Sequence, residues 1–284
     1  MILECLYLKD GVDPEYASRV LRQKVVEARN LKSGVPGTNI SAGLRLRDLY
    51  IDWVESTEQL LSSFALDTEA PSMVNSARYW RIRDMDERTA RPWSLIESEI
   101  KVQSEALDRL AADLDARAQR ARTAPGDLAV LDTNALLEYL PPDQIPWTEV
   151  CARSPIRLVV PVRVIEELDA KKYVARSDLA DRARRLLSQL EKVLGPGGCP
   201  AELREGVTIE VPLDAGRRLQ TRHADEEILE ACRELRLLTG RTILLVTADT
   251  AMRLRAQARE IPAVRIPAKY EPMRAPATPG DYPP

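Results

Sequence analysis

The sequence predicts an α/β protein in which a parallel sheet follows a mostly helical N-terminal region. From residue 125 onward, short apolar runs alternate with stretches of helical periodicity, which favours a parallel sheet with helices on both faces. Before residue 122, apolar residues instead recur at helical spacing over long stretches. Five strands are expected, at residues 128–131, 156–160, 207–211, 243–246 and, on a weaker pattern, 264–266.

The helical region is expected to contain three helices. Asp13-Pro14 has the form of an N-cap followed by proline in the first turn. Ser41 is a candidate cap for the second helix, and the third should run from about Trp93 to about Arg120. Its narrow apolar stripe suits a helical hairpin or a coiled-coil seam, so a scaffold, an oligomerisation arm or a regulatory role is expected.

The segment Ala124-Pro125-Gly126 marks the boundary between the two regions, because proline and glycine interrupt regular structure. We therefore expect a helical region at residues 1–122 and an α/β domain at residues 125–268. Residues 269–284 are rich in proline and are expected to be a disordered tail.

Composition narrows the class of protein. The 284 residues are 44% hydrophobic and 30% charged, as in a globular protein, and the net charge is −3, so any nucleic-acid contact must be a local basic patch. The four cysteines are far apart and form no Cys-x-x-Cys motif, which predicts reduced, mostly buried thiols. The sequence contains no membrane-length apolar stretch and no signal peptide, so a cytoplasmic protein without a membrane partner is expected.

Acidic residues occur at comparable places along the α/β region. Asp132 and Asp249 each follow a predicted strand, Glu166-Glu167 lies just beyond another, and Asp225 falls in the first turn of a predicted helix. In a parallel sheet, strand exits lie along one edge, so these carboxylates are expected to meet there. They would repel one another unless a cation neutralised them.

The chemistry of such a site follows from its ligands. A set of oxygen ligands suits Mg²⁺ or Mn²⁺, which bind through carboxylates together with substrate phosphate. The reaction that fits is metal-assisted hydrolysis of a phosphodiester, which needs no histidine or cysteine base. Each acid alone has an ordinary explanation, since Asp132 and Asp249 could be helix N-caps and the glutamates a solvated helix face.

The order and spelling of these motifs resemble the PIN domain family of metal-dependent ribonucleases, over roughly residues 128–267. The matching motifs are Leu131-Asp132-Thr133-Asn134, Glu166-Glu167-Leu168-Asp169, Asp225 with Ile228-Leu229, and Val246-Thr247-Ala248-Asp249. The resemblance implies a three-layer α/β/α fold with a five-stranded parallel sheet in the order 3-2-1-4-5. It also implies a pocket holding Mg²⁺ or Mn²⁺ and the cleavage of single-stranded RNA.

The resemblance also implies roles for individual residues. The expected catalytic, metal-binding acids are Asp132, Glu167, Asp225 and Asp249, with Glu167 preferred to Glu166 because the family's acid directly precedes the leucine. Residues expected to support these acids are Asn134, Thr247, Glu166 and Glu226. Basic residues expected to hold the RNA backbone are Lys171, Lys172, Arg222 and Arg253.

Other functions remain open at this point. The PIN-like fold could be a non-catalytic module that binds RNA or a protein, or a toxin-like ribonuclease of a toxin–antitoxin system. The large helical addition distinguishes the chain from small toxin forms. The protein is expected to form a homo-oligomer, either through its helices or through the surface of the PIN-like domain.

Overall fold

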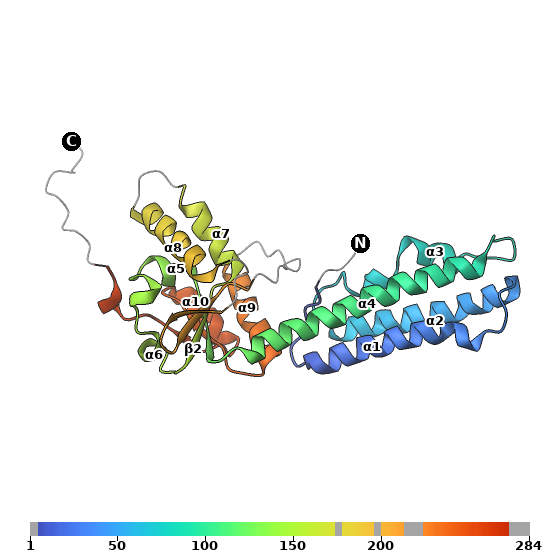
Figure 1. Cartoon of the computed structure of the whole chain (residues 1–284), viewed down its shortest axis with the longest axis horizontal. Helices are drawn as coiled ribbons and strands as arrows, with labels where there is room; N and C mark the ends of the chain where they lie inside the picture. The colour runs from blue at the N-terminus through green and yellow to red at the C-terminus, as the bar shows by residue number, and fades with distance from the viewer. Residues whose placement is uncertain (1–4, 174–177, 196–199, 213–223, 273–284) are drawn as a thin grey trace. The chain divides into compact units, whose positions relative to one another are not determined.

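The computed structural model describes residues 5–173, 178–195, 200–212 and 224–272 of the chain (Figure 1). The chain divides by its contacts into two compact units. Among the described residues, the first unit comprises 5–123 and Glu234–Gly240. The second comprises the described residues within 124–212, 224–233 and 241–272.

The first unit is built from helices that pack around a core of aliphatic and aromatic side chains. Its helices are α1 (Pro14–Asn30), η1 (Leu31–Gly34), α2 (Ile40–Phe64), η2 (Pro71–Val74), α3 (Ala77–Arg83) and α4 (Pro92–Thr123). The long helix α4 packs against α1 and α2, and its predicted apolar stripe, which includes Ile96, Leu107 and Leu114, is buried. Burying such a side chain stabilises the fold by about 1.5–3 kcal/mol.

The starts of the first two helices test the predicted caps. Asp13 caps α1 as expected, because its carboxylate accepts a hydrogen bond from the Glu15 amide. The prediction that Ser41 caps the second helix is wrong: α2 begins at Ile40, and the Asn39 side chain accepts from the Ala42 amide at 2.8 Å. Both asparagine and serine are good N-caps, so local preference did not distinguish the two positions.

A buried guanidinium organises one end of the first unit. Arg117 on α4 donates to the carbonyl of Leu6 at 2.6 Å and to the Asp113 carboxylate at 2.9 Å, and it pairs with Glu234. Glu234 belongs to the stretch Glu234–Gly240 that joins this unit from the far end of the sequence. A buried charge is costly without partners, so the Arg117 guanidinium needs these contacts. They connect three segments that are far apart in the sequence.

Close packing of two helices leads to a stability prediction at Gly43. A Cβ atom at this position of α2 would lie 2.6 Å from Cγ of Pro92, whose rigid ring cannot rotate away. Alanine gains about 1 kcal/mol over glycine inside a helix, but overpacking costs about 1–3 kcal/mol, so we expect Gly43→Ala to destabilise the protein in urea unfolding. Gly34→Ala is the control, because no atom lies within 4 Å of the added Cβ. Equal stability of the two variants would contradict this packing argument.

The second unit contains a six-stranded sheet in the order β3-β4-β2-β1-β5-β6. The strands are β1 (Asp127–Leu131), β2 (Ile156–Val159), β3 (Ala201–Arg204), β4 (Val207–Glu210), β5 (Leu244–Val246) and β6 (Ala263–Val264). Five of them are parallel and correspond to the expected strands in the order 3-2-1-4-5. The α/β class and this strand order are therefore confirmed.

The sixth strand, β3, corrects the prediction of a five-stranded sheet. It pairs antiparallel with β4, and the turn between them contains Gly206 with a φ of +71°. Apolar and charged side chains alternate along its four residues, and none of the four is fully buried. The strand therefore lacks the apolar run that identifies a central strand.

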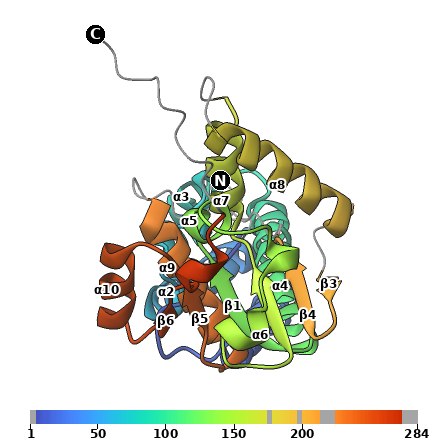
Figure 2. The same ribbon diagram turned by 90° about the vertical axis from the view of Figure 1, so that its left-hand side faces the viewer.

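Helices surround the sheet of the second unit. They are α5 (Thr133–Leu137), η3 (Pro142–Gln144), α6 (Trp147–Val150), α7 (Val162–Lys171), α8 (Asp178–Leu194), α9 (Ala224–Thr239, of which the residues up to Arg233 belong to this unit), α10 (Thr250–Ala258) and η4 (Ala268–Tyr270). Helix α8 packs beside β3 and α10 beside β6, at opposite ends of the sheet in Figure 2. Because β2, β1 and β5 are parallel neighbours, the residues that follow them meet at one edge.

Two expectations from composition have structural outcomes. Cys5, Cys151 and Cys232 are free and buried, and burial raises the pKa of the Cys5 and Cys151 thiols to about 12. Cys199 and most of the expected proline-rich tail, from residue 273, lie outside the described residues. No helix in the described ranges is both long and apolar enough to span a bilayer.

Candidate functional site

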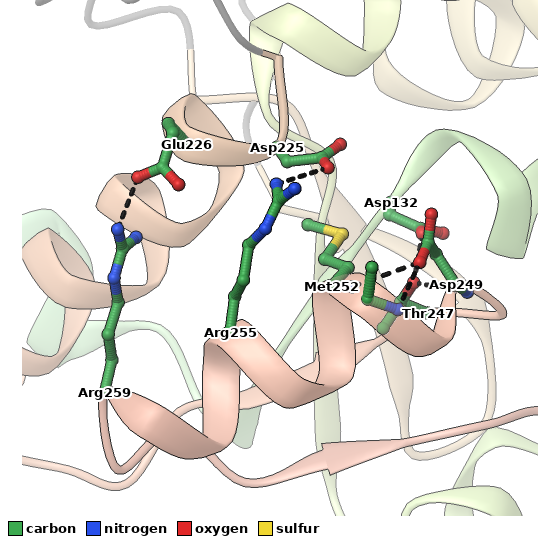
Figure 3. Close-up of polar contacts among 9 residues, drawn as sticks. Asp132, Asp225, Glu226, Thr247, Asp249, Met252, Arg255 and Arg259 are labelled. Carbon is green, nitrogen blue, oxygen red and sulfur yellow. Dashed lines mark hydrogen bonds and ion pairs between the residues drawn. The ribbon is translucent and has the colours of Figure 1, made fainter.

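Asp132 lies at the exit of the central strand β1 and is almost fully buried. Its Oδ1 accepts a hydrogen bond from the Ala135 amide at 2.5 Å, which makes Asp132 the N-cap of α5. Its Oδ2 accepts a hydrogen bond from the Thr247 hydroxyl, so both carboxylate oxygens are fixed (Figure 3). The cap explains the local geometry, and it leaves further lone pairs on both oxygens.

The electrostatic environment of Asp132 disfavours its ionised form. Burial raises its pKa from 3.8 to about 6, while the hydrogen bonds from Thr247 and Ala135 act in the opposite direction. The negative charges of Glu138 and Asp249 raise the pKa further. A buried carboxyl surrounded by like charges is a group that a bound cation would stabilise in its ionised form.

Thr247 connects the exits of β1 and β5. Its buried hydroxyl donates to Asp132 and accepts a hydrogen bond from the Asp249 amide at 3.0 Å. Asp249 in turn caps α10, since its Oδ1 accepts from the amides of Ala251 at 2.6 Å and Met252 at 3.1 Å. One threonine thus holds two of the expected acids in a fixed relation (Figure 3).

The two glutamates of α7 differ in their surroundings. Glu167 accepts a hydrogen bond from the buried hydroxyl of Thr133, the residue next to Asp132. The Glu166 side chain is 52% exposed, against 25% for Glu167, and lies 3.6 Å from Arg163. The structure therefore brings Glu167 to the exit of β1 and leaves Glu166 at the surface.

Asp225 and Glu226, in the first turn of α9, are paired with arginines of α10. The Asp225 Oδ2 accepts a hydrogen bond from Arg255 at 2.9 Å, and Glu226 pairs with Arg259 (Figure 3). Two acids adjacent in sequence thus meet two arginines separated by one helical turn. These contacts hold Asp225 by a charged side chain of the protein itself.

The other residues that were expected to bind RNA or to support the acids differ in their contacts. Arg253 donates to the carbonyl of Ala248 at 2.9 Å and to the Thr250 hydroxyl at 2.9 Å, which places it beside Asp249. Lys172 pairs with Asp169, and this contact raises the pKa of its ammonium group. Lys171 and Asn134 are half-buried, and Arg222 lies outside the described residues.

The donor set matches a hard divalent cation in type, since all candidate ligands are carboxylates. Within the described part of the chain, no three acidic, histidine or cysteine residues stand close enough together to hold an ion as they are. Asp132, with Asp249 held beside it through Thr247, has the excess negative charge that a cation would relieve.

Sequence reasoning missed two charged residues of this site, Glu138 and Arg163. Glu138 ends α5 and contributes negative charge at Asp132, while Arg163 lies between the Glu166 and Glu167 side chains. The helical spacing from Arg163 to the two glutamates is a signal that was present in the sequence. Glu138 had no comparable signal, because its position depends on where the short helix α5 ends.

Comparison with known families gives one match, which covers most of the second unit. Residues 129–266 match the family model described as the PIN domain. No curated protein matches the chain. The matched segment begins within β1 and ends after β6, so it includes part of β1, the other five strands and the acids described above.

Proposed function

Because residues 129–266 of this chain are a PIN domain, we propose that the protein is a metal-dependent endoribonuclease that hydrolyses phosphodiester bonds of single-stranded RNA. The PIN domain is a nuclease-type fold, and its members generally use divalent metal ions and bind RNA. The observation that carries the proposal is the buried Asp132, with a pKa raised to about 6 and with Glu138 and Asp249 adding negative charge. Such a group is costly in a purely structural role.

In this proposal, Asp132, Asp249, Glu167 and Asp225 hold Mg²⁺ or Mn²⁺. A bound divalent ion supplies a hydroxide at neutral pH and stabilises the leaving oxygen. The protein's own part is to fix the acids before substrate binds. Thr247 orients Asp132 and Asp249, and Thr133 orients Glu167, through the hydrogen bonds described above.

The substrate-binding part of the proposal rests on basic side chains around the acids. Arg253 supports it best, because its guanidinium is anchored to the loop that carries Asp249. Lys171 and Lys172, at the end of α7, and Arg222 are proposed to contact phosphates further along the RNA. A single strand suits such a site because its backbone can bend to present one phosphate to the acids.

The pair Glu167 and Glu166 gives a matched test of this function. We expect Glu167→Gln to reduce Mn²⁺-dependent cleavage of a single-stranded RNA by about 100-fold or more, because a proposed metal ligand loses its charge. Glu166→Gln should change the rate by less than about threefold, since its side chain is half exposed and exposed ion pairs contribute little. The measurement is the initial rate of cleavage of a fluorescent oligoribonucleotide.

The same assay separates the nuclease from a non-catalytic module. Equal rates for wild type and Glu167→Gln would contradict the proposed site. RNA binding without cleavage by any of the three proteins would instead favour a binding module.

The helical unit is proposed to act as a scaffold or oligomerisation arm for the PIN domain. Large apolar side chains are exposed on it, among them Val26 on α1, Leu49 on α2 and Val102 on α4. Sedimentation velocity of the full chain tests this role: a homo-oligomer is the expected result, and a monomer at high concentration would contradict it.

A further inference from the structure

The four acids proposed as metal ligands each already have a partner within the protein. Asp132 and Asp249 accept hydrogen bonds from backbone amides, and Asp132 and Glu167 accept from threonine hydroxyls. Asp225 differs, since in the described part of the chain it alone among the four receives its hydrogen bond from a charged donor, the guanidinium of Arg255. The hydrogen-bond donors of the other three are neutral groups that can stay in place when an ion binds, and the guanidinium near Glu167, that of Arg163, lies 3.8 Å from it, beyond hydrogen-bond distance.

The difference matters because a carboxylate can accept several contacts at once. An amide or hydroxyl occupies one lone pair and leaves others for a cation. A guanidinium also occupies one lone pair, but it places a positive charge beside the position that a cation would take. Two positive groups at one carboxylate repel each other, so the cation and Arg255 exclude one another at Asp225.

We propose that Arg255 competes with the divalent cation for the Asp225 carboxylate and thereby sets the affinity of the site for metal. This inference rests on the proposed function, because it takes Asp225 as a metal ligand. The ion pair can be displaced, since the Arg255 and Asp225 side chains are 47% and 38% exposed. Water stabilises both separated groups at such exposure, and the pair is therefore weak.

The neighbouring ion pair keeps the two helices in register while Arg255 is displaced. Arg259 lies one turn further along α10 and pairs with Glu226, the residue after Asp225 (Figure 3). Its side chain is 38% exposed, similar to that of Arg255. Because Glu226 is not one of the proposed ligands, Arg259 is a matched control of the same charge on the same helix.

The experiment is a calorimetric titration of the metal-free full chain with Mn²⁺. Removing one exposed positive charge is worth about a fivefold change in an equilibrium constant, so we expect Arg255→Gln to bind Mn²⁺ about fivefold more tightly than wild type. Arg255→Lys should bind with about the wild-type affinity, because it keeps the charge. Arg259→Gln should also resemble wild type.

Salt gives a second measurement that a purely structural effect would not reproduce. The advantage of Arg255→Gln over wild type should shrink as NaCl increases, since salt screens the repulsion between exposed charges. Equal or weaker Mn²⁺ binding by Arg255→Gln, or an equal gain in Arg259→Gln, would overturn the role of Arg255 and leave the proposed nuclease intact. Absence of Mn²⁺ binding in every protein would overturn both.

Discussion

Replacing Asp132 with asparagine is expected to abolish RNA cleavage and, in the metal-free protein above about pH 6, to stabilise the fold. Cleavage is lost because the proposed ligand loses its charge. Stability rises because burial holds the pKa of Asp132 at about 6, above its ordinary value of 3.8. The ionised carboxylate that wild type carries at neutral pH is thus unfavourable in the folded state.

The direction of the Asp132 pKa shift determines the pH range over which the stability of the fold changes. A group whose pKa is raised on folding contributes stability that is present below pH 3.8 and is lost as the pH rises through about 6. At neutral pH this loss amounts to at most about 3 kcal/mol, and asparagine avoids it. Asparagine also keeps the N-cap of α5, since it is as good a capping residue as aspartate.

Thermal unfolding of the metal-free proteins at about pH 4 and about pH 8 measures this effect. Asp132→Asn should unfold at a higher temperature than wild type at the higher pH, and at nearly the same temperature at the lower pH. Asp127→Asn is the control, because Asp127 lies at the other end of β1 and its side chain is 49% exposed. A variant that is destabilised at both pH values would contradict the electrostatic explanation.

Replacing Thr247 with valine is expected to slow RNA cleavage by about 10- to 100-fold, the usual effect of removing a group that orients a metal ligand. The buried Thr247 hydroxyl donates to Asp132 and accepts from the Asp249 amide. Valine leaves both groups without this partner, at a cost of about 1–3 kcal/mol for each buried group. The hydrogen bond also lowers the pKa of Asp132, so its loss raises that pKa above about 6.

The pH dependence distinguishes this effect from general damage. In Thr247→Val, the acidic limb of the rate profile should move to higher pH, because Asp132 must be ionised to bind metal. Thr247→Ser keeps the hydroxyl and should keep the wild-type profile. A slower variant with an unmoved acidic limb would contradict the proposed link between Thr247 and the ionisation of Asp132.

The sheet could be predicted because its five parallel strands are apolar runs with clear ends. The segment of β1 from Leu128 to Leu131 is buried on both faces, so its composition alone identifies it. The same strand fixes Asp132 at its exit, and the neighbouring strand β5 brings Thr247 to the same edge. These positions follow from local patterns combined with the topology of parallel sheets.

The pairing of side chains between helices could not be predicted in this way. The contact of Asp225 with Arg255 joins residues that are 30 positions apart, and it depends on how α9 and α10 lie against each other. Helix periodicity gives the face of each helix but not the register between two helices. The contact of Thr133 with Glu167 depends in the same way on the position of α7.

The edge strand β3 has a consequence for the solubility of the protein. Unpaired backbone groups at the edge of a sheet attract strands of other molecules and can begin aggregation. Here β3 is short, its pairing with β4 shifts register between Glu202 and Arg204, and both of these side chains carry charge. Such an edge is a poor template for another strand, so β3 protects the parallel sheet from growing into fibrils at this side.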